Sequence, residues 1–351
     1  MAEMLEPFDP AFVTLFAELA DRVADARLIE ELPPGGTFER RVINGRPYWY
    51  HRSYNRTSGK DSVRYVGPTS ADLDGRVARH AGLKADVQGR RRLVSALRRA
   101  GFPHPDPFTG EILAALARTG LFRLRACLVG TVAFQTYAGM LGIRLPAGAM
   151  RTEDVDLAQF HAVALAVGDT AAPPFDALRE IDPTFGPVPG LASPLIATAF
   201  ANARGFRVEF LTPHQGTDDR GDRPVALPTM PGLHAQPLRF LDFLIYGETS
   251  TVVLHGAGLR VNVPTPERYA VHKLIVATRR AEAGRVKALK DVAQASVLFR
   301  ALRQVRQGDL VSDAWNEARQ RGPAWRKVIE QGAARLDPEG AEALKECLGG
   351  A

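Results

Sequence analysis

Three carboxylates inside apolar stretches are the residues of this sequence best suited to do chemistry. Asp154 and Asp156 stand one residue apart in RTEDVDLAQF, and Glu209 interrupts the apolar stretch GFRVEFLTP. If both stretches are strands, Asp154 and Asp156 lie on one face, because successive strand side chains alternate. Neighbouring carboxylates repel unless a proton, a basic group or a divalent metal ion compensates them. The three acids therefore indicate a metal centre for phosphoryl transfer, and a solvated strand end is the simpler alternative.

A glycine at the junction of a strand and a helix precedes these acids. In RLRACLVGTVAFQTYAGMLG, a short apolar strand over 124–129 leads into Gly130 and Thr131, and a helix follows to about Gly142. Free backbone N–H groups at such a junction, with no side chain on the glycine, allow a phosphate to approach closely. Many α/β proteins contain such junctions, so this feature alone indicates little about function.

Positive charge is concentrated before these motifs. Residues 36–101 hold fifteen Lys and Arg against five Asp and Glu, a net charge of +10, whereas the whole chain is +6. Aromatic residues are interleaved with the arginines, as in surfaces that stack on bases and pair with phosphates. A small sheet with an aromatic core and solvated arginines is the alternative. The candidate nucleic-acid contacts are Arg46, Tyr48, Tyr50, Arg52, Arg56, Lys60, Arg64, Arg90, Arg91 and Arg92.

The elements that must position these residues follow from periodicity and turn residues. An amphipathic helix is predicted over 9–30, a three-stranded meander from Thr37 with a turn at Asn44-Gly45, and a helix over about 70–100. The stretch FPHPDPFTG is the clearest linker, and the next helix is expected to start at a Thr109 cap. These patterns predict four parts, namely 1–35, 36–101, 108–264 and 265–351.

The order LVGT, EDVDL and VEF resembles the nucleotidyltransferase fold of the DNA polymerase beta superfamily. With YWY and RYVGP before these motifs, the chain looks like a bacterial branch of that superfamily that carries a basic N-terminal module. The resemblance covers about residues 40–300. It implies an α/β (α+β) fold in which helices flank a mixed sheet, with a helical C-terminal region after the N-terminal meander and helix.

The resemblance also assigns roles to individual residues. Gly130 and Thr131 would hold the triphosphate of an NTP. Asp154 and Asp156 would bind two Mg²⁺ ions, or Mn²⁺ in their place, and Glu209 would bind the catalytic ion and help to deprotonate the attacking hydroxyl. Thr131 stands where Ser or Gly is usual, and Glu209 stands where many members have Asp.

A lysine in the helix after residue 264 is a further candidate. Thr265, Pro266 and Glu267 form a typical helix start, and in similar proteins a lysine at the place of Lys273 faces the nucleotide phosphates. A solvated surface lysine is the alternative.

Two functions remain open at this point. The first is Mg²⁺-dependent transfer of an NMP to a hydroxyl of nucleic acid, RNA or DNA, or of a protein, in a toxin-like or defence role with a protein partner or antitoxin. The second is a catalytically silent nucleic-acid-binding protein. Cys127 and Cys347 have no metal-ligand spacing, and no run of about 18 apolar residues occurs. We therefore expect a cytoplasmic protein without membrane association.

Overall fold

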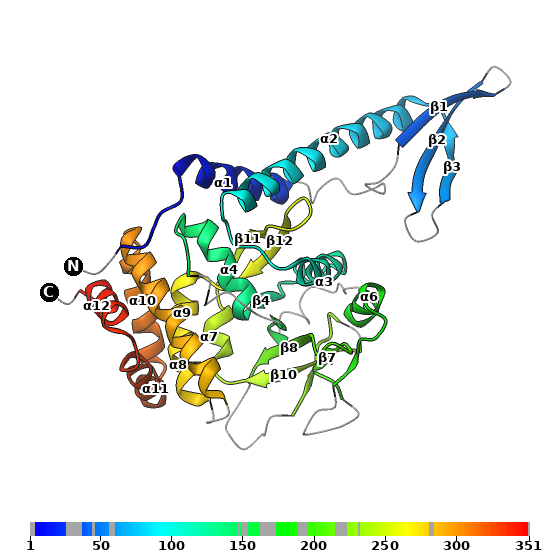
Figure 1. Cartoon of the computed structure of the whole chain (residues 1–351). Coiled ribbons are helices and arrows are strands. Elements are labelled where there is room, and N and C mark those ends of the chain that lie inside the picture. Colours follow the sequence, from blue (N-terminus) through cyan, green and yellow to red (C-terminus); the bar gives the residue numbers. More distant parts are fainter. Residues whose placement is uncertain are drawn as a thin grey trace.

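The protein consists of a projecting N-terminal arm, a mixed sheet with flanking helices, and a C-terminal group of helices (Figure 1). The structure is a computed structural model. It describes residues 4–25, 37–43, 46–55, 60–146, 148, 154–161, 173–188, 196–214, 223–230, 232–280 and 284–349. The mixed α/β arrangement confirms the predicted fold class.

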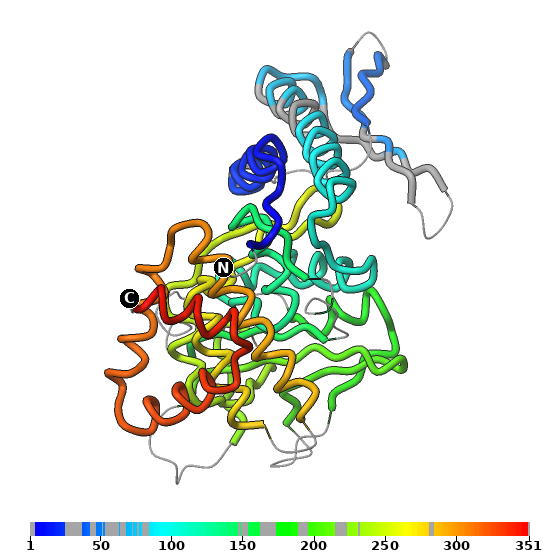
Figure 2. The backbone as a smooth tube through the Cα atoms, turned by 60° about the vertical axis from the view of Figure 1, so that its left-hand side comes forward, coloured from blue at the N-terminus to red at the C-terminus, as the bar shows by residue number. Residues whose placement is uncertain are grey.

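The arm begins with α1 (Pro10–Asp25), which packs beside α2 (Ala71–Arg99) (Figures 1 and 2). Between these helices, β1 (Thr37–Ile43), β2 (Arg46–Asn55) and β3 (Lys60–Pro68) form the predicted antiparallel meander. The indole N–H of Trp49 donates to the carboxylate of Asp74 at 2.6 Å, which attaches the meander to the first turns of α2. Since a helix rises about 1.5 Å per residue, the 29 residues of α2 span about 43 Å and carry the meander away from the remaining structure.

The sheet has the strand order β4-β5-β8-β10-β9, and β7 pairs with β8 outside this path. Its strands are β4 (Cys127–Val129), β5 (Asp154–Ala158), β8 (Arg207–Pro213), β10 (His234–Leu238), β9 (Val225–Ala226), β7 (Ala199–Ala201) and β6 (Gly186–Pro187). β5, β8 and β10 run parallel, whereas β4 runs antiparallel to β5. A separate hairpin of β11 (Thr249–Val253) and β12 (Leu259–Val263) lies near α1.

Helices α3 (Pro107–Arg118), α4 (Gly130–Leu141), α6 (Pro174–Ile181) and α7 (Leu241–Ile245) surround the sheet. The prediction that Thr109 caps α3 is wrong. The carboxylate of Asp106 caps the helix by accepting the N–H groups of Phe108 and Thr109, each at 3.0 Å, and Pro107 fills the first helical position. The helix therefore begins inside the stretch predicted to be a linker, at an aspartate followed by a proline.

The C-terminal region is helical, as predicted. It contains α8 (Pro266–Arg279), α9 (Arg285–Gln304), α10 (Gly308–Gln320), α11 (Pro323–Ala333) and α12 (Pro338–Cys347). α8 is the central helix and packs against α9, α10 and α11. No helix among the described residues is both long and apolar enough to cross a membrane.

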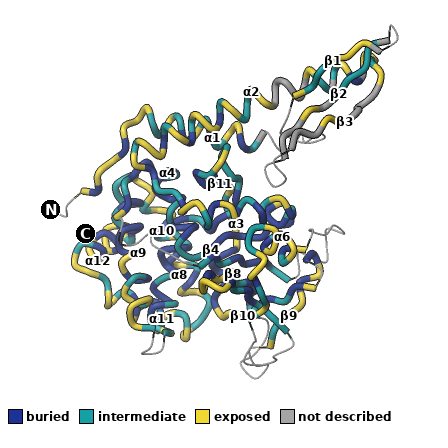
Figure 3. Tube along the Cα trace, turned by 45° about the vertical axis from the view of Figure 1, so that its right-hand side comes forward, coloured by how far each residue is buried: buried dark blue, intermediate teal, exposed yellow. Residues whose placement is uncertain are grey.

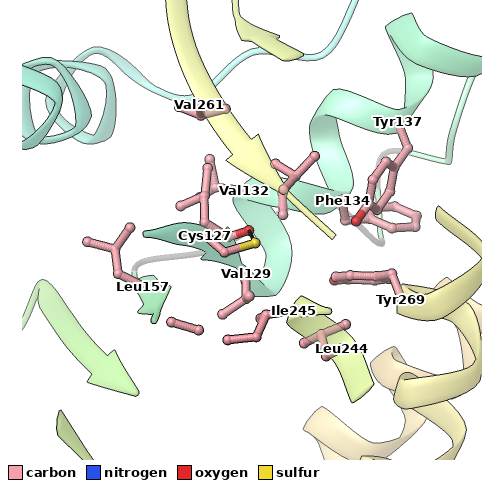
Figure 4. Packing of buried hydrophobic residues seen from close by; sticks show 14 of the residues in the cluster. Cys127, Val129, Val132, Phe134, Tyr137, Leu157, Leu244, Ile245, Val261 and Tyr269 are labelled. Carbon is pink, nitrogen blue, oxygen red and sulfur yellow. Dashed lines mark hydrogen bonds between the residues drawn. The ribbon is translucent and has the colours of Figure 1, made fainter. Parts of the chain in front are cut away.

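One hydrophobic core joins the sheet to the helices around it and to the C-terminal helices (Figures 3 and 4). Figure 4 shows Val129 and Leu157 of the sheet close to Cys127, and Tyr137 of α4 close to Tyr269 of α8. Both tyrosines are buried, and their hydroxyls donate to backbone carbonyls, that of Tyr137 to Pro264 at 2.8 Å. Burial raises the pKa of the Cys127 thiol, which fits a packing role rather than a reactive one.

Candidate active site

The three predicted carboxylates lie on one face of the sheet, on the adjacent parallel strands β5 and β8. Asp156 is directly opposite Glu209, and Asp154 is directly opposite Arg207. Val155 is fully buried while Asp154 and Asp156 are half-buried, so the predicted alternation along β5 is confirmed. Strand pairing thus brings together residues that are more than fifty positions apart in the sequence.

Gly130 is required by the geometry beside Asp156. It has a φ of +68°, in the left-handed region that favours glycine. A Cβ at this position would lie 2.5 Å from the Oδ2 atom of Asp156. Gly130 also begins α4, and the preceding Val129 provides no side-chain cap. The first N–H groups of α4 therefore remain available for an anion at the same place as the carboxylates.

A cavity of about 1070 Å³ opens over this face of the sheet, and α8 and α9 form its opposite wall. All six predicted nucleotide and metal residues line it: Gly130, Thr131, Asp154, Asp156, Glu209 and Lys273. The lining contains seven Lys and Arg side chains against four Asp and Glu. The cavity therefore suits a ligand with several negative charges.

Basic side chains contact two of the three carboxylates. Glu209 forms an ion pair with Arg207, which lies two residues before it on β8, and Asp154 lies 3.5 Å from the Nζ atom of Lys287. Within the part of the chain that the structure describes, no three His, Cys, Asp or Glu side chains converge closely enough to hold a metal ion. The three carboxylates thus line one cavity, and two of them are paired with the side chains of Arg207 and Lys287 rather than with one another.

Asp156 is the carboxylate whose environment is least compensated. Burial raises its pKa to about 7, and the negative charges of Asp154 and Glu209 add to this effect. Lys273 and Lys287 act in the opposite direction but do not cancel it. A carboxylate with such a pKa is a common feature of functional sites, because the folded protein holds excess negative charge there.

Lys273 is held by a buried carboxylate. Its Nζ atom donates to Asp291 at 2.7 Å, and the other oxygen of Asp291 accepts from Arg280 at 2.5 Å. The side chain of Lys273 is 11% exposed and that of Asp291 is 3% exposed. Lys273 is therefore not the solvated surface lysine of the alternative interpretation.

Sequence reasoning missed several side chains that line the same cavity, namely Arg207, Arg239, His272, Arg279 and Arg280. Arg207 follows the same alternation as Glu209, so a period-two reading of β8 could have found it. Burial and the charge of Lys273 lower the pKa of His272 to about 3, so this side chain is neutral at physiological pH.

The predicted nucleic-acid residues of the arm have different environments. Arg91 and Arg92 are exposed on α2, and Arg52 is exposed on β2, where it lies 3.6 Å from Glu39. Arg90 is buried, pairs with Asp86 at 2.7 Å, and donates to the carbonyl of Ala257 at 3.2 Å. These contacts make Arg90 an anchor between α2 and the loop that joins β11 to β12.

The remaining predicted contacts of the arm are aromatic or undescribed. Tyr48 and Tyr50 are half-buried on β2, and Arg41 lies 5.1 Å from the ring centre of Tyr50. Arg56 and the side chains of Arg46, Lys60 and Arg64 lie outside the described residues.

Further exposed arginines continue the basic surface along α2. Arg98 and Arg99 are exposed and follow Arg91 and Arg92 by seven residues, or two helical turns. Val94 and Leu97 face the interior instead. The outer side of α2 therefore presents a basic stripe formed by Arg91, Arg92, Arg98 and Arg99.

Two family models match this chain. One, described as nucleotidyltransferase, matches residues 108–320, which include the whole cavity lining. The other, described as a domain of unknown function, matches residues 13–74, from α1 through the meander. No curated protein and no solved structure matches the chain.

Proposed function

This chain belongs to the nucleotidyltransferase family, and on that basis we propose that it is a metal-dependent enzyme that moves an NMP from an NTP to a hydroxyl acceptor. The single observation that carries this proposal is the cavity in which Asp154, Asp156 and Glu209 face Gly130-Thr131 and Lys273. An anion site at a helix start beside three carboxylates suits a triphosphate that is bound together with cations.

The side chains present suit Mg²⁺ or Mn²⁺ in kind. Carboxylate oxygens are the preferred protein ligands of these hard ions, and the raised pKa of Asp156 indicates a place where added positive charge is favourable. Asp154 and Asp156 would hold two ions and Glu209 would hold the catalytic one. When bound, the ions would act as Lewis acids that neutralise charge on the transferring phosphate.

The chain's own groups supply binding and proton transfer. The hydroxyl and backbone N–H of Thr131 and the N–H groups that start α4 would hold the phosphates, and Lys273 would offset their charge. Glu209 would accept the proton of the attacking hydroxyl once Arg207, its ion-pair partner, has moved away from it. The oxygen–phosphorus bond to the acceptor forms as the bond between the α-phosphorus and the leaving pyrophosphate breaks.

Nucleic acid is the acceptor that we favour, RNA or DNA, because the basic stripe on α2 and the basic meander belong to the same chain as the cavity. A protein hydroxyl is the other acceptor class. A toxin-like or defence role, with an antitoxin or other protein partner, is an extension of this proposal.

A catalytically silent nucleic-acid-binding protein is the second candidate. The observation in its favour is that Arg207 and Lys287 already contact Glu209 and Asp154. Basic side chains in those positions can stand where an active enzyme binds its metal ions.

One labelling experiment separates the two candidates. The protein is incubated with Mg²⁺, each α-labelled NTP in turn, and bulk RNA, DNA or protein. We expect transfer of label by the wild-type protein and by Asp313→Ala, an exposed residue of α10, and a loss of at least a hundredfold in Asp154→Ala and Asp156→Ala. If no acceptor takes up label in an aspartate-dependent manner, the enzymatic proposal is wrong.

A further inference from the structure

The basic side chains of the cavity lining fall into two groups. Lys273 and Arg280 share Asp291, and Lys287 contacts Asp154. These cations lie beside the carboxylates, where the phosphates of an NTP are proposed to bind. Two further arginines of the lining, Arg239 and Arg279, lie beside Phe240.

Arg239 and Arg279 lie close to one aromatic ring of the cavity lining, that of Phe240. The guanidinium of Arg279 lies 5.1 Å from the ring centre of Phe240, and that of Arg239 lies 6.0 Å from it. Phe240 is buried, whereas both arginines are exposed. We call Arg239, Phe240 and Arg279 the outer cluster. Both guanidinium groups lie against the ring of Phe240, and both arginines are accessible to solvent.

Sheet topology separates the outer cluster from the phosphate end. Gly130 follows β4 directly, and Arg239 follows β10 directly, with β5 and β8 between these two strands. Neighbouring strands lie about 4.8 Å apart, so the two positions are about 14 Å apart across the strands. They also lie at different levels along β8, because Val129 is level with Glu209 and Leu238 pairs with Pro213. The cavity volume of about 1070 Å³ lies at the upper end of the usual range for ligand pockets, about 300–1,000 Å³.

A hydrophobic side chain accompanies the outer cluster. Leu238 precedes Arg239, lines the cavity, and is 40% exposed. An exposed leucine beside two guanidinium groups offers an apolar contact to a base while the arginines contact phosphates. That combination suits a nucleotide unit of a strand better than it suits an isolated inorganic anion.

We propose that the outer cluster binds backbone phosphates of a single-stranded nucleic-acid acceptor, so that the end of the strand reaches the carboxylates through the cavity. This inference rests on the proposed function and names its acceptor class. The basic stripe of α2 would bind more distant parts of the same molecule.

Binding measurements test the outer cluster without turnover. Fluorescein-labelled tetranucleotides of uridine and of deoxythymidine are titrated with the wild-type protein and with Arg239→Gln/Arg279→Gln, and binding of ATP with Mg²⁺ is measured by calorimetry. We expect the variant to lose at least tenfold in tetranucleotide affinity, with its salt slope reduced by about 1.4, since each phosphate contact on a single strand contributes about 0.7. The affinity for ATP should change less than twofold, and saturating ATP should not displace the tetranucleotide.

Matched controls make the result decisive. Arg118→Gln/Arg326→Gln removes two exposed arginines of α3 and α11 outside the cavity lining and should bind both ligands as the wild-type protein does. The single variant Arg279→Gln tests the same point if the double variant is unstable. Unchanged tetranucleotide affinity overturns the inference, and so does a parallel loss of ATP affinity, which would assign the arginines to the nucleotide.

The two proposals can fail separately. Tetranucleotide binding that depends on the outer cluster, without aspartate-dependent labelling of any acceptor, would support a silent strand-binding protein. Aspartate-dependent labelling with unchanged tetranucleotide affinity would leave the enzyme and remove the strand from the outer cluster.

Discussion

Replacing Asp156 with Asn should stabilise the metal-free protein at alkaline pH. In the folded state the pKa of Asp156 is raised from 3.8 to about 7 by burial and by the carboxylates of Asp154 and Glu209. Each pKa unit corresponds to 1.36 kcal/mol, so the ionised side chain costs the folded state about 4 kcal/mol. Asn has nearly the same shape and cannot ionise, so the variant avoids this cost.

The sign of the effect fixes its pH window. Above pH 7 the carboxyl group of Asp156 is ionised in both states, and the full cost is present. As the pH falls from 7 towards 3.8, the folded state takes up the proton first, and the wild-type protein regains stability relative to the variant. The difference in unfolding free energy should therefore decline from about 4 kcal/mol at pH 8 to near zero at pH 4.

Urea unfolding in EDTA at several pH values measures this difference. Titrating groups that are not coupled to Asp156, His272 among them, cancel because both proteins contain them. The exposed residue Asp313 of α10 supplies the control, and Asp313→Asn should match the wild-type protein at every pH. Added Mg²⁺ should stabilise the wild-type protein, by about 2.7 kcal/mol at a hundredfold excess over its Kd, and the Asn variant much less. A pH-independent difference, or a variant less stable than the wild-type protein at pH 8, would refute the reasoning.

Three further predictions concern the surroundings of the site. His272→Gln should reduce the loss of stability as the pH falls from 6.5 to 3. The pKa of His272 is about 3 in the folded state and 6.5 in the unfolded state, so protonation opposes folding by up to about 5 kcal/mol. The free energy of unfolding measured as a function of pH tests this, and an unchanged pH dependence contradicts it. Asp291→Asn should destabilise the protein by about 3–5 kcal/mol, because Lys273 would remain buried without its partner; a midpoint of urea unfolding equal to wild type would contradict this. Gly130→Ala should lower the rate of nucleotidyl transfer at least tenfold, since a Cβ would lie 2.5 Å from the Oδ2 atom of Asp156 at a left-handed φ. The labelling rate is measured with variant protein whose unfolding matches that of the wild-type protein, and a wild-type rate contradicts the prediction.

Local pattern was enough to predict where the carboxylates point. Alternation along β5 requires only consecutive residues, so the shared face of Asp154 and Asp156 follows from the sequence. The position of Glu209 opposite Asp156 depends on strand pairing across fifty residues, which no local pattern encodes. The grouping of Glu209 with the two aspartates was expected from an isolated carboxylate in an apolar stretch and from the resemblance to other nucleotidyltransferases, but neither predicted which residue it would face.

Long-range packing explains what the sequence could not indicate. The burial of Lys273 depends on Asp291 of the next helix, and the anchor role of Arg90 depends on the carbonyl of Ala257. In the sequence, Arg90 cannot be distinguished from Arg91 and Arg92. Only the packing of one face of α2 against the interior makes Arg90 buried and Arg91 exposed. Burial of a single member of a basic run is therefore a tertiary property.

The ion pairs of Glu209 with Arg207 and of Asp154 with Lys287 are too weak to show that the protein is catalytically silent. The side chain of Lys287 is 67% exposed, and both members of the Arg207–Glu209 pair are substantially solvated. Pairs in such surroundings contribute about 0–1 kcal/mol each, because water screens them and two flexible side chains must be ordered. Divalent ions that relieve the raised pKa of Asp156 could regain more than both pairs contribute, since that shift corresponds to about 4 kcal/mol. The resting contacts are thus compatible with a site that exchanges Arg207 and Lys287 for metal ions when the nucleotide binds.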